Sequence, residues 1–248
     1  MSTPSVPGAP AGANAQAEPR SLFLVALPRS LSTLVHDLCA YALDLRSPSW
    51  ARGGEILNGD QLVLQPESTE GTSRKFNLAD ERIIQQRIRA FLSDVVQPHG
   101  RLYRDVVQPF AVTRWLKENP MPTLWVRRPL ADIAFSLSRQ QLSFPARAGG
   151  GEGDELDQVL RGLVRARKAL GTLGAEEIEF DHLVRDEEEL RTALGRLYPD
   201  HQLPPLRYRN ADFRRLTEVV LGHRVSREWL EIQERALRAE DAVAAEGS

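Results

Sequence analysis

Cysteine is nearly absent from this chain of 248 residues, in which Cys39 is the single one. A disulfide framework or a cysteine-based zinc site within one chain is therefore excluded, and a reducing cytoplasm is the expected location. Long apolar runs are also lacking, because the longest, Leu22–Leu27, has six residues where a membrane span needs about 20. The first residues lack the basic start and apolar core of a secretory signal.

The sequence also has no excess of positive charge: its formal net charge is −2, so no global basic field attracts nucleic acid. Lysine is scarce, since only Lys75, Lys117 and Lys168 stand among 32 basic residues and the others are arginines. Any anion site is therefore expected to use arginine, whose planar fork binds bidentately. No pair among the five histidines has metal-ligand spacing, so no metal site is predicted.

The composition, 42% hydrophobic and 27% charged, is that of a soluble globular protein. Residues 1–20 are rich in Pro, Gly, Ala and Ser and are predicted to be a disordered tail, and residues 239–248 are interpreted in the same way. The Gly-rich stretch Pro145–Asp154 predicts a loop inside the fold. No internal repeat is visible, so residues 21–238 are expected to form one domain.

Apolar runs alternate with helical patterns along this domain. Strands are predicted at Leu22–Leu27, Thr123–Val126 and Glu177–Phe180, with Arg101–Asp105 as a less regular fourth. Helices are predicted at Ser32–Leu45, Asp80–Val96, Asp132–Gln141, 155–170 and Asp186–Leu197, and after a Ser226 cap. This alternation favours an α/β fold with a mostly parallel central sheet flanked by helices, in which ligands bind at the carboxyl ends of the strands.

The first strand runs directly into a polar turn and then a helix, in the segment Leu22–Leu34 (LFLVALPRSLSTL). The turn offers backbone N–H groups, the hydroxyls of Ser30, Ser32 and Thr33, and the guanidinium of Arg29. Such groups at a helix N-terminus form an anion site. The alternative is an ordinary connection with Ser32 as the helix cap. The Walker A sequence of NTPases is absent.

A second strand also ends in basic residues, in the segment Thr123–Arg139 (TLWVRRPLADIAFSLSR). Arg128 is expected at the exit of the strand and Ser136 about one turn into the following helix, so both can converge on one phosphate. The alternative is a solvated strand end with a serine bonded to its own backbone. Two anion sites at neighbouring strand ends suit a ligand with two separated phosphates.

These segments resemble the motifs of the PAPS-dependent sulfotransferases, which use 3'-phosphoadenosine 5'-phosphosulfate and release PAP. Pro28–Thr33 (PRSLST) is similar to the family's phosphosulfate loop, P-[KR]-S-G-[ST]-[ST], with Leu31 in place of the glycine. Arg128–Ser136 (RPLADIAFS) is similar to the 3'-phosphate motif in its Arg-to-Ser spacing, and the adjacent Arg127 stays open as the alternative arginine. Glu179–Leu183 (EFDHL) is similar to the "YEDL" strand end of many bacterial members.

The resemblance implies a P-loop-like sulfotransferase fold and a cytoplasmic enzyme that moves sulfuryl from PAPS to a hydroxyl or amine of a small molecule. It assigns the donor to these residues: Arg29, Ser30, Leu31, Ser32, Thr33, Arg128 and Ser136. For the C-terminal Arg-Lys-Gly loop of cytosolic-type members there is no clean match, and Arg209, with Arg207 and Arg214, are the candidates.

In-line transfer needs charge at the bridging oxygen and a base for the acceptor's proton. Arg29 is expected to supply that charge. Gly53–Asn58 (GGEILN) resembles the "G-E-F-L-N" stretch of bacterial and carbohydrate-type members, which makes Glu55 the first candidate for the base and Asp105 the second. Arg104 is expected to face the transferring group, as the family's lysine does.

Two other functions remain compatible with the sequence. One is a nucleotide-binding, kinase-like transferase of related fold, which the missing Walker A sequence disfavours. The other is a non-catalytic interaction protein that uses the amphipathic helix at 226–238 as its partner surface. A small-molecule acceptor is the expected partner, a homodimer stays open, and neither membrane nor nucleic acid is expected.

Overall fold

The centre of the protein is a four-stranded sheet in the order β2-β1-β3-β4, in which all neighbouring strands are parallel. A computed structural model describes residues 18–57, 82–142, 146–150, 152–208 and 211–246. The strands are β1 (Leu22–Ala26), β2 (Leu102–Asp105), β3 (Thr123–Arg127) and β4 (Glu176–Glu179). The predicted α/β class with a parallel sheet flanked by helices is confirmed, and the less regular fourth strand is β2.

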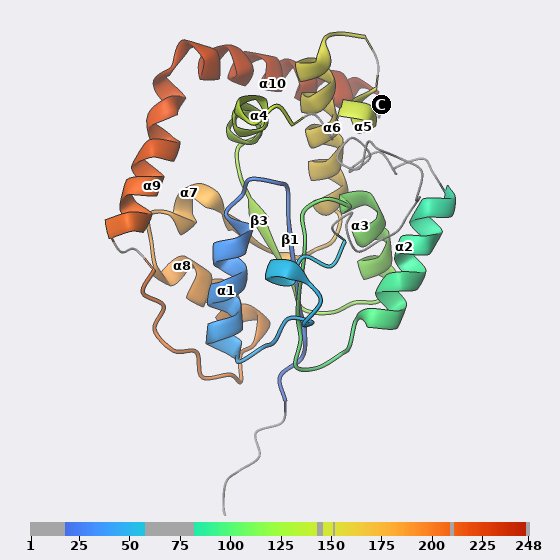
Figure 1. Ribbon diagram of the computed structural model, residues 1–248, viewed down its shortest axis with the longest axis vertical. Coiled ribbons are helices and arrows are strands. Elements are labelled where there is room, and N and C mark those ends of the chain that lie inside the picture. The colour runs from blue at the N-terminus through green and yellow to red at the C-terminus, as the bar shows by residue number, and fades with distance from the viewer. Residues whose placement is uncertain (1–17, 58–81, 143–145, 151, 209–210, 247–248) are drawn as a thin grey trace, which may run out of the picture.

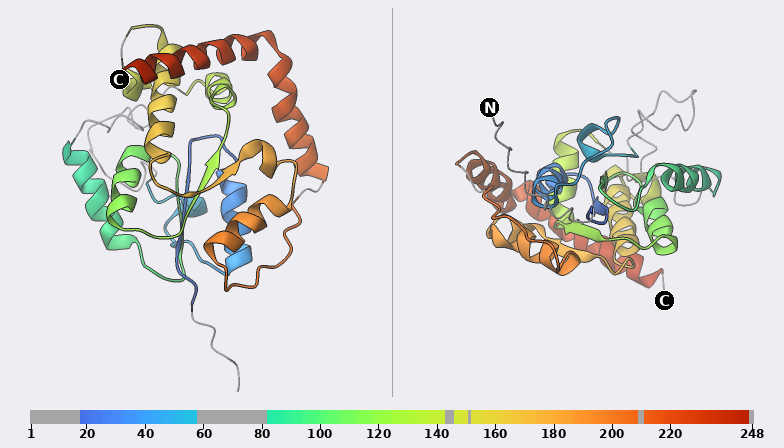
Figure 2. Two further views of the ribbon diagram at one scale, coloured as in Figure 1. Left: turned by 180° about the vertical axis from the view of Figure 1, so that it is seen from behind. Right: turned by 90° about the horizontal axis from the view of Figure 1, so that it is seen from below.

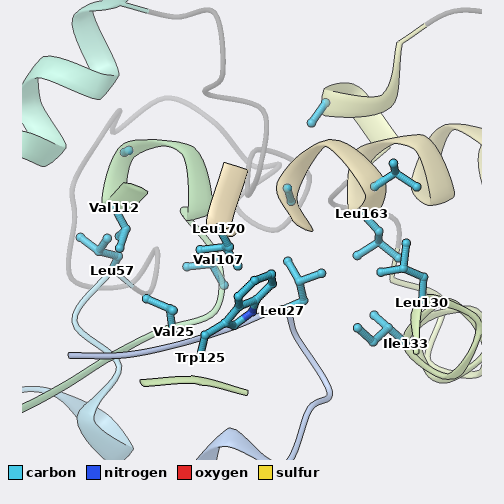
Figure 3. Packing of buried hydrophobic residues seen from close by; sticks show 14 of the residues in the cluster. Val25, Leu27, Leu57, Val107, Val112, Trp125, Leu130, Ile133, Leu163 and Leu170 are labelled. Atoms are coloured by element: carbon cyan, nitrogen blue, oxygen red, sulfur yellow. The ribbon is translucent and has the colours of Figure 1, made fainter. Parts of the chain in front are cut away.

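Strand β1 is apolar throughout because it is covered on both faces. Phe23 and Val25 point into one hydrophobic cluster, and Leu22 and Leu24 point into the other. Side chains alternate between the faces of a strand, so a central strand of a parallel sheet needs apolar residues at every position. Figure 3 shows the first cluster, where Val25 lies beside Trp125 of β3.

Helices cover both faces of the sheet (Figures 1 and 2). The hydrophobic cluster on one face includes residues of α2 (Arg82–Val95), α3 (Pro109–Glu118), α4 (Leu130–Arg139) and α6 (Glu155–Leu170). It also includes residues of α10 (Arg227–Ala245), which packs against α4 and α6. The cluster on the other face includes residues of α1 (Ser32–Leu43), α7 (Phe180–Leu183), α8 (Glu188–Leu197) and α9 (Ala211–Gly222). Short helices complete the described chain: α5 (Ala146–Gly149), η1 (Arg52–Gly54) and η3 (His223–Val225). None of the described helices is long and apolar enough to cross a membrane.

The C-terminal helix α10 corrects one prediction. Residues 239–248 were predicted to be a disordered tail, but α10 continues to Ala245 and buries Ala239 and Val243. Figures 1 and 2 show α10 running across α4 and α6. The Ala-rich composition suggested a tail, whereas small side chains at helical spacing allow α10 to pack closely. The predicted cap is confirmed, since Ser226 Oγ accepts a hydrogen bond from Trp229 N at 3.2 Å.

Other predictions differ in detail. Helix α3 was not predicted at all. The Gly-rich loop Pro145–Asp154 contains the short helix α5, and Arg161 of α6 donates hydrogen bonds to the carbonyl of Gly150 at 3.0 and 2.6 Å. This part of the loop is therefore tied to α6. Residues 1–17 of the predicted N-terminal tail lie outside the described residues. Cys39 is fully buried in α1.

Candidate active site

The turn between β1 and α1 has an unusual backbone. Arg29 and Leu31 both adopt left-handed conformations, with φ of 66° and 57°. For a residue with a side chain this conformation costs about 1–3 kcal/mol, and part of the cost at Leu31 is offset because its side chain packs against the second hydrophobic cluster. The turn thus tolerates a side chain where the resembled family has glycine.

The same turn leaves the start of α1 open. Leu31 occupies the N-cap position and makes no side-chain capping bond. The N–H groups in the first turn of a helix have no partner inside the helix, and together with the helix dipole they attract an anion. Ser30 Oγ is buried and has no hydrogen-bond partner among the described residues. An anionic ligand could accept hydrogen bonds from these N–H groups and from the Ser30 hydroxyl.

Arg128 follows β3 and reaches the same turn. Its side chain is only 5% exposed, its Nη1 donates a hydrogen bond to the carbonyl oxygen of Arg29, and its guanidinium lies 4.5 Å from the ring centre of Phe180. Burial lowers the pKa of Arg128, and the nearby Asp132 carboxylate opposes this shift. The guanidinium is therefore held in place from several sides.

The side chain of Arg127, the alternative arginine, forms ion pairs on β4. Its Nη1 lies 2.7 Å from a carboxylate oxygen of Glu177 and 3.1 Å from one of Glu179, both on β4. Arg128 lines the main cavity at the strand ends, and Arg127 is not among the residues lining it. The geometry thus favours Arg128 over Arg127 as the phosphate-binding arginine.

A cavity of about 710 Å³ lies at the carboxyl ends of β1, β2 and β3, where the sequence predicted a ligand. It brings together the residues predicted to bind the donor, except Arg209. Its walls include Arg29, Ser30, Leu31, Ser32, Thr33, Glu55, Arg104, Arg128 and Ser136. Arg29 Nε donates a hydrogen bond to Ser136 Oγ at 3.1 Å, so the two predicted anion sites meet in one cleft.

Arg104 connects this turn to Glu55. Its buried guanidinium donates hydrogen bonds to Ser32 Oγ at 3.2 Å and Thr33 Oγ1 at 2.5 Å, and its Nη2 lies 3.4 Å from Glu55 Oε2. Burial lowers the pKa of Arg104, and the Glu55 carboxylate opposes that shift. Glu55, with a side chain 16% exposed, presents a carboxylate at the cavity wall.

Close packing beneath the turn fixes the position of Glu55. Gly54 has a φ of 74°, and a Cβ atom there would lie 2.1 Å from Nε2 of the buried His36. His36 is itself held at Ser47 Oγ by a 2.6 Å hydrogen bond and at Asp37 Oδ1 by one of 2.9 Å. Burial lowers the pKa of His36, which favours the neutral ring. A glycine is needed at position 54 because the His36 ring occupies the space that a Cβ atom would take.

Asp105, the second candidate for the base, has a different position. It is 2% exposed and is not among the residues lining the cavity. Its carboxylate accepts hydrogen bonds from Val107 N at 3.2 Å and Gln108 N at 3.0 Å, where the chain enters α3. Burial raises its pKa to about 7, against the effect of these N–H donors. The geometry gives Asp105 a role in holding the chain between β2 and α3.

The C-terminal third supplies a wall that sequence reasoning missed. Val219, Val220 and His223 line the cavity, and the His223 ring stacks on Phe135 at 4.4 Å between ring centres. The predicted Arg209 lies outside the described residues. Its two companions are described and exposed but are not among the residues lining the cavity: Arg207 and Arg214.

A buried carboxylate anchors this wall. Asp132 of α4 accepts hydrogen bonds from Arg224 Nε at 3.0 and 3.1 Å and from Trp229 Nε1 at 2.9 Å. Among the described residues, no group of three or more His, Cys, Asp or Glu could hold a metal ion.

No family model and no curated protein matches this sequence. Among the solved structures that are similar to it, three are described as a sulfotransferase or a sulfotransferase domain, the family whose motifs the sequence resembles. The domain from the curacin biosynthetic pathway is 15% identical over 75% of this chain and 76% of that chain, with a TM-score of 0.47. The domain from the Synechococcus PCC 7002 olefin synthase is 18% identical over 93% and 96%, with a TM-score of 0.48. The enzyme from Alicyclobacillus acidocaldarius is 17% identical over 91% and 100%, with a TM-score of 0.45.

Proposed function

We propose that this protein is a sulfotransferase that uses PAPS and transfers its sulfuryl group to a hydroxyl or amine of a small molecule. One observation carries the proposal: Arg29 and Arg128 line one cavity beside the partnerless hydroxyl of Ser30, with the carboxylate of Glu55 in the wall of the same cavity. Separate cationic groups and a base are what in-line transfer from a bisphosphorylated donor requires.

The turn after β1 and the second motif would bind different groups of the donor. The N–H groups at the start of α1, the Ser30 hydroxyl and Arg29 would hold the phosphosulfate. Arg128 and Ser136 would hold the 3'-phosphate, the arginine with two parallel hydrogen bonds. The hydrogen bond from Arg29 to Ser136 and that from Arg128 to the Arg29 carbonyl keep the two subsites in fixed register.

Glu55 is the proposed general base. As the acceptor oxygen or nitrogen forms its bond to sulfur, the bridging S–O bond breaks, its electron pair stays on the phosphate of PAP, and the acceptor's proton passes to Glu55. Arg29 stabilises the charge that develops on the leaving oxygen, and it does so only electrostatically because arginine does not give up its proton. Arg104 keeps the Glu55 carboxylate next to the turn.

Calorimetry with PAP tests the donor, and PAPS turnover with a panel of acceptors tests the reaction. We expect PAP to bind and ATP to bind far more weakly, since the turn has no Walker A lysine. Preference for ATP would favour the kinase-like alternative. PAP binding without turnover of any acceptor would favour the non-catalytic alternative.

A further inference from the structure

The carboxylate of Asp132, in the first turn of α4, is enclosed by protein. The Asp132 side chain is 0% exposed. The nearest cation is Arg224, whose Nε lies 3.0 Å from Oδ1 and 3.1 Å from Oδ2 and whose Nη2 also donates to Oδ2. Trp229 Nε1 donates to Oδ1 at 2.9 Å. Both carboxylate oxygens are therefore taken by groups from the C-terminal wall.

Arg128 stands on the other side of the same carboxylate and is bound to it less closely. Its Nε lies 3.5 Å from Asp132 Oδ2, at the limit of a hydrogen bond. The stronger contacts of Arg128 are to the Arg29 carbonyl and the face of Phe180. Asp132 thus stands between two guanidinium groups, and the one from the C-terminal wall holds it more tightly.

Arg224 also binds a second carboxylate. Its Nη1 donates to Asp181 Oδ2 at 3.0 Å and its Nη2 donates to Asp181 Oδ1 at 2.7 Å. The hydrogen bonds from Arg224 lower the pKa of Asp181, which keeps it ionised. Two carboxylates and two guanidinium groups, those of Arg128 and Arg224, therefore balance to zero, and Arg29 adds a positive charge on the cavity side.

We propose that Arg224 is a positioning residue for Arg128: it occupies the carboxylate of Asp132, so that Arg128 stays at the cavity as a phosphate-binding cation. This inference rests on the proposed PAPS-binding function. Without Arg224, the group made of Asp132, Asp181 and Arg128 has a net charge of −1, and Arg128 is the remaining guanidinium bonded to Asp132 among the described residues. A carboxylate at this distance in a poorly hydrated site pulls Arg128 inward and repels a phosphate.

The test is PAP affinity by calorimetry in Arg224→Met and in a matched control, Arg227→Met. Each change removes one arginine, and the two positions are three residues apart, but the Arg227 side chain is 94% exposed and pairs with Glu231 on the surface. We expect Arg224→Met to bind PAP at least ~10-fold more weakly, the scale of a lost charge-assisted interaction. Arg227→Met should bind PAP as the unchanged protein does.

A second pair of variants separates positioning from simple anchoring of the wall. Arg224→Met with Asp181→Asn restores the charge balance without restoring the anchor, so we expect it to recover PAP affinity several-fold over Arg224→Met. Arg224→Gln removes the charge but keeps a hydrogen-bond donor toward Asp132. It should bind PAP about as weakly as Arg224→Met, and it takes the place of that variant if Arg224→Met does not fold. Thermal unfolding of each variant checks that the fold persists.

The outcomes are distinct. If the unchanged protein does not bind PAP, the proposed function is wrong and this inference fails with it. If the unchanged protein binds PAP and folded Arg224→Met or folded Arg224→Gln binds it equally well, the inference alone is wrong. If the double variant binds no better than Arg224→Met, Arg224 serves only as an anchor and the inference is likewise overturned.

Discussion

Arg29 Nε donates a hydrogen bond to Ser136 Oγ at 3.1 Å, across a sequence separation of 107 residues. One residue belongs to the turn after β1 and the other to the helix after β3. Since β1 and β3 are neighbouring parallel strands, their carboxyl ends bring both segments to one edge of the sheet. The bond makes a single binding surface out of two motifs, and the predictions below depend on that surface.

Replacement of Arg128 should weaken PAP binding, whereas replacement of the adjacent Arg127 should not. Arg128→Ala should weaken PAP binding by ~1.5–3 kcal/mol, the range for a hydrogen bond to a charged group. Arg127→Ala should leave PAP affinity unchanged, because Arg127 pairs with Glu177 and Glu179 instead. PAP affinity is measured by titration of both variants. Equal losses of affinity would contradict the assignment of the 3'-phosphate subsite to Arg128.

Arg29→Ala should abolish sulfuryl transfer while the protein stays folded. The Arg29 side chain is exposed at the cavity, so its loss leaves the hydrophobic core intact. Without it, the guanidinium assigned to the charge on the leaving oxygen is lost. Single-turnover release of PAP from PAPS measures the effect, and the melting temperature is the control. Unchanged turnover would remove Arg29 from the chemistry.

Glu55→Gln should lower turnover on the order of 100-fold, the usual contribution of a general base. PAP affinity should stay within a few-fold, because the amide keeps the shape of the side chain and the donor-binding groups are untouched. Turnover and PAP binding are measured side by side. A large loss of PAP affinity with normal turnover would instead mean that Glu55 organises the turn through Arg104.

Asp105 should make the protein less stable as the pH rises. Burial raises its folded-state pKa from 3.8 to about 7, so the folded protein retains the proton over a range in which the unfolded chain has lost it. Stability contributed by this proton should be fully present below about pH 4 and lost towards pH 7, on the order of 4 kcal/mol in total. Denaturant unfolding at several pH values measures the slope, which Asp105→Asn should flatten. The same slope in the variant would show that Asp105 is not its source.

Gly54→Ala should destabilise the protein more than Gly174→Ala. Both glycines have positive φ, 74° and 62°, but a Cβ at Gly174 meets nothing within 4 Å. Gly174→Ala should cost ~1 kcal/mol from backbone strain alone. Gly54→Ala adds a collision with His36 and should cost a further ~1–3 kcal/mol and lower turnover by displacing Glu55. Chemical denaturation compares the two, and equal costs would mean that His36 moves aside freely.

The sequence predicted those features that depend on local pattern. Apolar runs marked the strands because a doubly covered sheet requires them, and the polar turn after Leu27 marked the cavity. The choice between Arg127 and Arg128 needed the structure, because spacing allowed both and only the position of β4 shows that Arg127 meets Glu177 there.

Features that depend on distant contacts were missed. The ion pair between Arg224 and Asp132 joins residues 92 apart, and nothing in the local sequence of either one signals the other. The same holds for the end of α10, where Ala239 is buried in a helix that packs against α4 and α6. Asp105 was the second candidate for the base after Glu55, and the sequence did not reveal that its carboxylate accepts backbone N–H groups.

The lone thiol of Cys39 has a practical consequence. It is fully enclosed in α1, and burial raises its pKa, so in the native protein it is neither accessible to a labelling reagent nor ionised enough to react. A thiol-specific dye added to the native protein should therefore react only when α1 separates from the sheet. The rate of labelling then reports the rate at which the protein opens, and the measurement needs no introduced or removed cysteine.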